Sequence, residues 1–168
     1  MDKERLAILE ASIKEQLKLI KKLHEEIKKK INNFKSSPEA IDSMAYKLHN
    51  LYCAYEELFE IVADFFENQI EGIRYHINLL RRMKLYIEGI RPNLISEDVY
   101  LLLDELRKFR HFFRHAYGVK LDPEKIEMKA KIKNKKIANL AELKKFQNFC
   151  INLSFPKNFR YYRLFYKK

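Results

Sequence analysis

The ten residues FRHFFRHAYG, at positions 109–118, combine two arginines and two histidines with aromatic side chains. An imidazole titrates near neutral pH and can transfer protons, whereas a guanidinium keeps its charge and binds phosphate oxygens with a planar set of donors. Arg110 and His115 therefore have the chemistry to break RNA without a metal. In that reaction the attacking 2′-hydroxyl loses a proton, the leaving 5′-oxygen gains one, and the phosphate gathers negative charge. The sequence shows no compact carboxylate cluster of the kind that a two-magnesium nuclease requires.

The spacing of these residues raises a geometric difficulty on a regular helix. Arg110 and Tyr117 are seven residues apart and share a face. His111 and His115 are four apart and also share a face. His115, however, lies about 140° round the helix from Arg110, at roughly 100° per residue. These two side chains converge only if the helix is distorted or if a second copy of the chain completes the site.

A purely structural interpretation of the same stretch stays open. A histidine and an arginine near the C-terminal end of a helix complement the helix dipole, and the phenylalanines between them can be ordinary core residues. Arg114 fits two roles equally well, a phosphate-binding group or the partner of an acid on a neighbouring helix. His76, further back in the sequence, fits a structural or interface role best.

The residues that must position this stretch are predicted to form amphipathic helices. Residues 2–34 place apolar side chains three and four positions apart, which gives one apolar stripe. Residues 38 to about 70 carry a wide apolar face that suits a central helix with two neighbours. Ser37 and Ser96 are candidate N-caps, and Gly118 is a candidate C-terminal cap. Further helices are predicted over residues 75–86, 97–117 and 123–149.

The composition favours an all-α protein. Apolar residues make up 47% of the 168-residue chain and charged residues 34%, with three glycines and four prolines. We expect a four- or five-helix up-and-down bundle over residues 1–150 and a basic, aromatic tail over residues 151–168. Of the net charge of +11, +10 lies between Glu124 and Lys168. This concentration fits a nucleic-acid partner or, equally, a solvated lysine-rich segment.

The remaining features point to a cytoplasmic protein. The N-terminus is charged from its second residue and has no apolar region of the signal-peptide type. No apolar run is long enough to span a membrane. Cys53 and Cys150 are far apart and lack a CxxC partner, so we expect reduced thiols rather than a zinc site. Neither a metal nor a cofactor is expected.

Three features of the sequence match one known family. The first is the motif R-x4-H-x-Y, formed by Arg110, His115 and Tyr117. The second is YHINLLRRM at 75–83, and the third is the block from Arg91 to Ile126 that includes the motif. Together they resemble the HEPN-domain ribonuclease toxins of the HEPN/MNT toxin–antitoxin type, whose second segment reads (W/Y)HxxLLRRM. The resemblance is specific from about residue 70 to 127, unspecific before it, and lost after about residue 145.

The resemblance implies a HEPN-like helical bundle that forms a homodimer, with two copies of the motif facing a shared cleft. It implies RNA as substrate and Arg110 and His115 as the catalytic pair, with His111 as an auxiliary residue; Arg114 is a further candidate for phosphate binding. It also implies a nucleotidyltransferase antitoxin that transfers AMP to Tyr117. Such a modification would place negative charge beside groups that bind RNA phosphate.

Two functions from different classes remain. The first is a metal-independent endoribonuclease toxin, which the intact Arg110, His115 and Tyr117 motif favours. The alternative is a non-catalytic RNA- or nucleotide-binding helical dimer that serves as partner of a nucleotidyltransferase. A protein whose purpose is to bind the antitoxin is compatible with the first, because a toxin of this type is also the antitoxin's substrate.

Overall fold

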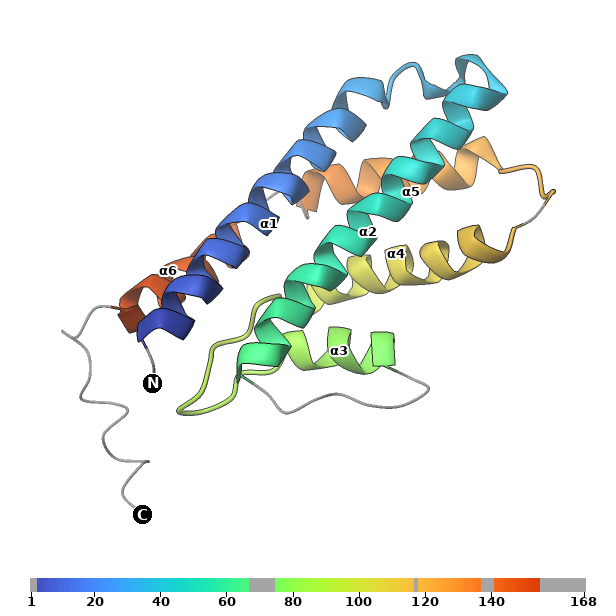
Figure 1. Cartoon of the computed structure of the whole chain (residues 1–168). Helices are drawn as coiled ribbons and strands as arrows, with labels where there is room; N and C mark the ends of the chain where they lie inside the picture. The colour runs from blue at the N-terminus through green and yellow to red at the C-terminus, as the bar shows by residue number, and fades with distance from the viewer. Residues whose placement is uncertain (1–2, 67–74, 117, 137–140, 155–168) are drawn as a thin grey trace.

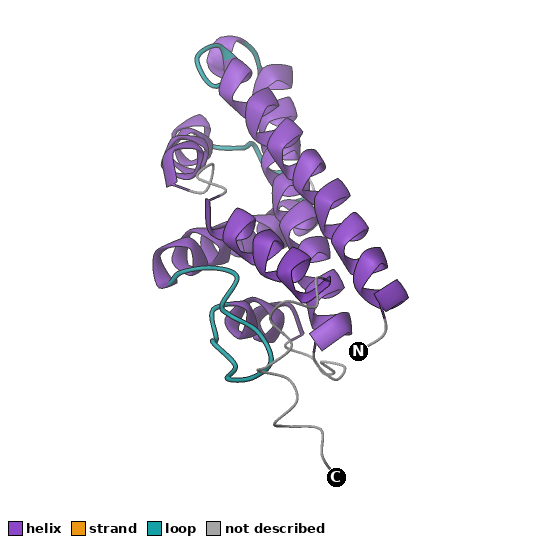
Figure 2. Cartoon of the chain, turned by 90° about the vertical axis from the view of Figure 1, so that its left-hand side faces the viewer, coloured by secondary structure: helices purple, strands orange, loops and turns teal. Residues whose placement is uncertain are grey.

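The chain forms helices arranged around one long central helix (Figure 1). The computed structural model describes residues 3–66, 75–116, 118–136 and 141–154. In these ranges every regular element is a helix, as Figure 2 shows, and the predicted all-α class is confirmed. The elements are α1 (Lys3–Lys30), the 3₁₀ helix η1 (Phe34–Ser36), α2 (Pro38–Phe66), α3 (Tyr75–Met83), α4 (Glu97–His115), α5 (Pro123–Lys136) and α6 (Ala141–Ser154).

Helices α1 and α2 lie side by side and antiparallel (Figure 1). The apolar stripe predicted for α1 is the buried face, and it also includes two polar side chains, Gln16 and His24. The Gln16 amide donates to the carbonyl of Ala54 at 2.8 Å, and Nε2 of His24 lies 2.9 Å from the Tyr55 hydroxyl. These directional contacts fix the register of α1 on α2, which apolar packing alone would specify less strictly.

Helix α2 is the centre of the molecule. It contacts α1, α3, α4 and α5, which is more than the two neighbours that the width of its apolar face predicts. Ser37 caps its start as expected, because the Ser37 hydroxyl accepts a hydrogen bond from the Ala40 amide at 3.2 Å. Twelve of its residues are buried: Met44, Ala45, Leu48, Leu51, Tyr52, Ala54, Tyr55, Glu56, Leu58, Phe59, Val62 and Ala63.

Helix α3 ends at Met83, earlier than the predicted end at residue 86. The segment that follows binds this end: the Leu94 amide donates to the Met83 carbonyl at 2.9 Å, and Arg91, a residue only 1% exposed, binds carbonyls on both sides of Met83. Its Nη2 donates to the carbonyl of Arg82 at 3.0 Å, and its Nη1 donates to the carbonyl of Leu85 at 3.2 Å. The chain then reverses through Gly89, whose φ of 73° suits a glycine. Arg91 thus joins α3 to the segment that leads into α4.

Helix α4 begins at its predicted cap. The Ser96 hydroxyl accepts a hydrogen bond from the Val99 amide at 3.4 Å, and acidic residues occupy the first turn. The helix ends at His115, two residues before the predicted end, and Gly118 follows with a φ of 71°. The position of Tyr117 lies outside the described residues.

The single helix predicted over 123–149 is wrong, because two helices occupy this region. Helix α5 buries Ile126 and Ala130 and contacts α1, α2 and α4, whereas α6 buries Leu143, Phe146 and Cys150 and packs mainly on α1. Six α-helices are therefore described where four or five are predicted. Residues 155–168, most of the predicted basic tail, lie outside the description, so the 150/151 boundary stays a prediction.

Two further observations concern the described residues. Within the described ranges neither cysteine takes part in a disulfide; Cys150 is buried and Cys53 is half-buried. None of the described helices combines the length with the apolar content that crossing a lipid bilayer requires.

We predict that Arg91→Ala lowers the free energy of unfolding by about 2–4 kcal/mol, because it removes a buried side chain together with its hydrogen bonds to the carbonyls of Arg82 and Leu85. Urea unfolding followed by circular dichroism measures this loss. Arg81→Ala, at an exposed position of α3, is the matched control and should change the free energy by less than about 0.5 kcal/mol. Equal effects of the two substitutions would contradict the structural role of Arg91.

Candidate functional site

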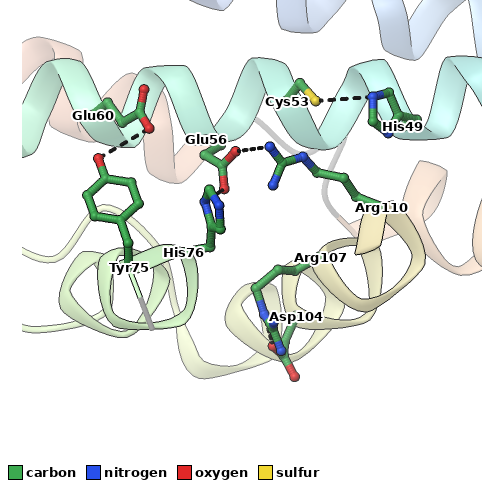
Figure 3. Close-up of polar contacts among 9 residues, drawn as sticks. All are labelled: His49, Cys53, Glu56, Glu60, Tyr75, His76, Asp104, Arg107 and Arg110. Atoms are coloured by element: carbon green, nitrogen blue, oxygen red, sulfur yellow. Dashed lines mark hydrogen bonds and ion pairs between the residues drawn. The ribbon is translucent and has the colours of Figure 1, made fainter. Parts of the chain in front are cut away.

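The packing of α4 decides which residues of the 109–118 stretch point inward. Leu103, Leu106 and Phe109 are buried, each three residues from the next, and they set the face of α4 that lies on the core. Arg110 follows Phe109 and lies at the edge of this face, against α2 (Figure 3). His111 and His115 are exposed. The helix therefore divides the predicted site residues into an inner arginine and outer histidines.

The guanidinium of Arg110 is held in place by two residues of α2. Its Nη2 lies 3.1 Å from Oε2 of Glu56, and its central carbon lies 5.8 Å from the centre of the Tyr52 ring. The Arg110 side chain is 16% exposed, and its buried Nε has no hydrogen-bond partner within the residues described. An ion pair together with a cation–π contact restricts this side chain far more than an exposed salt bridge would.

The carboxylate of Glu56 contacts two groups at once, the guanidinium of Arg110 and the imidazole of His76. Its side chain is 8% exposed; Oε2 contacts Arg110, and Oε1 lies 2.7 Å from Nδ1 of His76. Figure 3 shows Glu56 on α2 between His76 of α3 and Arg110 of α4. Burial, and secondly the negative charge of Glu56, raise the pKa of the Tyr52 hydroxyl far above its ordinary value. Three helices thus meet at one carboxylate, with a tyrosine that stays protonated beside it.

A second histidine near Arg110 is His49 of α2, which lies on the other side of the guanidinium (Figure 3). Nε2 of His49 is 3.6 Å from the Cys53 sulfur, and the His49 ring contacts that of Phe113 at 5.4 Å. Burial lowers the pKa of His49, and the positive charges of Arg110 and Arg114 lower it further. His49 is therefore held in its neutral form near the guanidinium.

The other predicted site residues lie apart from Arg110. The rings of His111 and His115 contact each other, with centroids 4.9 Å apart, and Arg114 is exposed. No hydrogen bond, ion pair or ring contact within the described ranges joins His115 to Arg110. The angular separation predicted from the spacing therefore persists in the single chain. Tyr117, the predicted acceptor of AMP, falls outside the description.

The sequence alone does not identify Glu56 and Tyr52 as residues of the candidate site, and it favours only a structural or interface role for His76. One signal for Glu56 was present, because an acidic residue occupies the otherwise apolar face of residues 38–66. No comparable signal linked it to Arg110, since 54 positions separate the two in the sequence. The structure gives His76 an ion-pair partner at the site, beyond the general structural role that its sequence context favours.

We predict that Arg110→Ala raises the pKa of His49 toward the ordinary value of about 6.5, because it removes a nearby positive charge that favours the neutral imidazole. A proton NMR titration measures the shift, with the His49 signal assigned by its loss in His49→Gln. Arg107→Ala removes an arginine that is paired with Asp104 and should leave the pKa of His49 unchanged. Equal shifts in both variants would contradict the described geometry.

One family of known proteins matches most of the helices described above. The family model described as HepT-like protein matches residues 43–153, from α2 to α6. No curated protein and no solved structure matches the chain. The match extends on both sides of residues 70–127, the segment over which the sequence resemblance is specific. It also continues beyond residue 145, after which that resemblance is expected to be lost. Because it spans more than half of the chain and confirms that resemblance, this protein belongs to the HepT-like family.

Proposed function

We propose that this protein is a metal-independent endoribonuclease and the toxin of a toxin–antitoxin pair. Family membership supports the proposal, and one structural observation carries it: the guanidinium of Arg110 is anchored by Glu56 and Tyr52. Stabilising a charged transition state requires donors that are fixed before the reaction begins. An arginine that only complemented a helix dipole would not need an ion pair with a buried acid of another helix.

In the proposed reaction the ribose 2′-hydroxyl attacks the adjacent phosphorus, and the bond from phosphorus to the 5′-oxygen breaks. Arg110 stabilises the negative charge on the phosphate, because a guanidinium has five N–H donors and Glu56 engages only Nη2. His115 transfers a proton to the leaving 5′-oxygen. His111, whose ring contacts that of His115, and the exposed Arg114 assist in holding RNA.

The proposed active unit is a homodimer in which the motifs of two chains face a shared cleft. The reason is geometric: on α4 of one chain, Arg110 points to the core edge while His115 is exposed. Groups from two chains can meet where those from one chain do not. The positive charge of the segment from Glu124 onward favours the approach of RNA to this assembly.

Regulation is proposed to act through Tyr117, two residues beyond the end of α4. A nucleotidyltransferase antitoxin would transfer AMP from ATP to its hydroxyl. The new phosphodiester carries negative charge and bulk, and it lies in the sequence beside Arg114 and His115. It would therefore compete with RNA phosphate for the same positive groups.

We predict that the wild-type protein cleaves cellular RNA in EDTA and that Arg110→Ala lowers the rate by about 100-fold or more, because a donor to the developing charge is lost. Gel analysis of RNA at several time points measures the rate. Arg107→Ala removes the same charge one helical turn away, from a residue paired with Asp104 at 2.8 Å, and should keep most of the activity.

Binding of RNA without cleavage by the wild-type protein would instead support the non-catalytic RNA- or nucleotide-binding dimer. Equal losses in Arg110→Ala and Arg107→Ala would show that net charge, rather than the anchored guanidinium, matters.

We also predict that incubation with the partner nucleotidyltransferase, ATP and magnesium adds one or more AMP units to the protein and abolishes RNA cleavage. Intact-mass spectrometry detects the addition, and peptide mapping locates it. Tyr117→Phe should not be modified, whereas Tyr86→Phe, at an exposed tyrosine of the α3–α4 connection, should be modified like the wild type. Full modification of Tyr117→Phe would assign the acceptor to another residue.

A further inference from the structure

His76 is placed like a histidine whose proton transfer is controlled by a carboxylate. Its Nδ1 lies 2.7 Å from Oε1 of Glu56, while its side chain is 45% exposed. A carboxylate this close to one ring nitrogen attracts the ring proton, so it favours the neutral tautomer that carries the proton on that nitrogen. The lone pair is then on Nε2, which makes no hydrogen bond within the part of the chain that the structure describes. The ring is thus prepared to accept a proton from a molecule in solvent.

The same carboxylate also holds the proposed phosphate-binding group. Oε1 of Glu56 contacts His76 of α3, and Oε2 contacts Arg110 of α4 (Figure 3). A phosphate bound to Arg110 would therefore lie close to the imidazole of His76, with no rearrangement of the backbone. By contrast, no contact within the described ranges connects Arg110 to His115 of the same chain. Of the two histidines, His76 is the one that a single chain already places beside the guanidinium.

We propose that His76 is a catalytic residue of the RNA-cleavage reaction, the general base, and that Glu56 is the positioning residue for both His76 and Arg110. This inference rests on the proposed ribonuclease function. Nε2 of His76 takes the proton of the 2′-hydroxyl, and the 2′-oxygen forms a bond to phosphorus. The bond from phosphorus to the 5′-oxygen breaks, and His115 gives its proton to that oxygen. The products are a 2′,3′-cyclic phosphate and a 5′-hydroxyl, so atoms and charge balance.

The charged surroundings of His76 come from two helices. Glu56 and Glu60 face it from α2, and Arg110 reaches the same carboxylate from α4. On α3 itself, the hydroxyl of Tyr75 donates to Glu60 at 3.2 Å. Burial raises the pKa of Glu60, and the hydrogen bond from Tyr75 opposes that rise. Glu56 is the acid in direct contact with the ring. A base must be unprotonated to act, so this role predicts a loss of rate as the pH falls.

The role of each histidine can be separated with a modified substrate. At the cleaved linkage of a defined RNA, the bridging 5′-oxygen is replaced by sulfur, whose thiolate leaves without a proton because thiols are far more acidic than alcohols. In EDTA, we expect His76→Gln and His115→Ala each to slow cleavage of ordinary RNA by about 100- to 10,000-fold. The sulfur substrate should restore the rate of His115→Ala to near that of the wild type, but it should not restore His76→Gln.

Two further variants test the positioning role of Glu56. Glu56→Gln keeps the size of the side chain but removes its charge, so we expect a loss of at least about 10-fold that the sulfur substrate does not restore. Glu57→Gln is the matched control, because Glu57 is the next residue and is exposed. It should cleave both substrates like the wild type. Melting temperature and circular dichroism establish whether each variant is folded. If His76→Gln does not fold, cleavage of the two substrates by Glu56→Gln still tests the proposal.

The pH dependence gives an independent measurement. On ordinary RNA, kcat/KM of the wild type should fall at low pH, and this low-pH limb of the profile should flatten in His76→Gln but remain in His115→Ala. If His76 were merely structural, its replacement would leave the low-pH limb unchanged. Wild-type activity in His76→Gln, an unchanged low-pH limb, or rescue of that variant by sulfur would each overturn the inference. A wild-type protein that cleaves neither RNA would instead remove the proposed ribonuclease function itself.

Discussion

Glu56 carries a negative charge on a helix face that is otherwise apolar, and such a charge is costly to bury alone. The structure offsets that cost with two partners, the guanidinium of Arg110 on one carboxylate oxygen and the imidazole of His76 on the other. Because His76 and Arg110 come from α3 and α4, the same contacts fix both helices relative to α2. Electrostatic compensation at one residue therefore determines the arrangement of the whole candidate site.

The rest of the fold supports this arrangement at a distance. Arg91 binds the carbonyls at the end of α3 and so fixes the connection from α3 to α4. On the opposite side of α2, the buried hydrogen bonds of Gln16 and His24 set the register of α1. Helix α2 thus receives polar constraints from both sides, and its own side chains form both the core and the wall of the site. Stability and the proposed activity depend on the same element.

The sequence alone predicts the local features of this structure well and its tertiary contacts poorly. Short-range sequence patterns predict three features that the folded chain shows: the N-cap at Ser96, the apolar stripe of α1 and the central position of α2. They do not predict the end of α3, where Arg91 binds a carbonyl from nine residues away. The division of α4 into an inner Arg110 and an outer His115 follows from helical spacing, but the partners of Arg110 lie on α2, far away in the sequence. Their pairing depends on how α2 and α4 pack.

The buried position of Glu56 also has an evolutionary consequence. Replacing a buried ionic network by apolar side chains of similar volume is often neutral or stabilising, so neither His76 nor Arg110 is expected to be retained for folding alone. A laboratory selection for heat resistance without a requirement for toxicity should therefore accumulate apolar replacements at these three positions together. Lineages under selection for toxicity should keep all three, because the proposed cleavage reaction uses Arg110 and His76 and depends on Glu56 to position both.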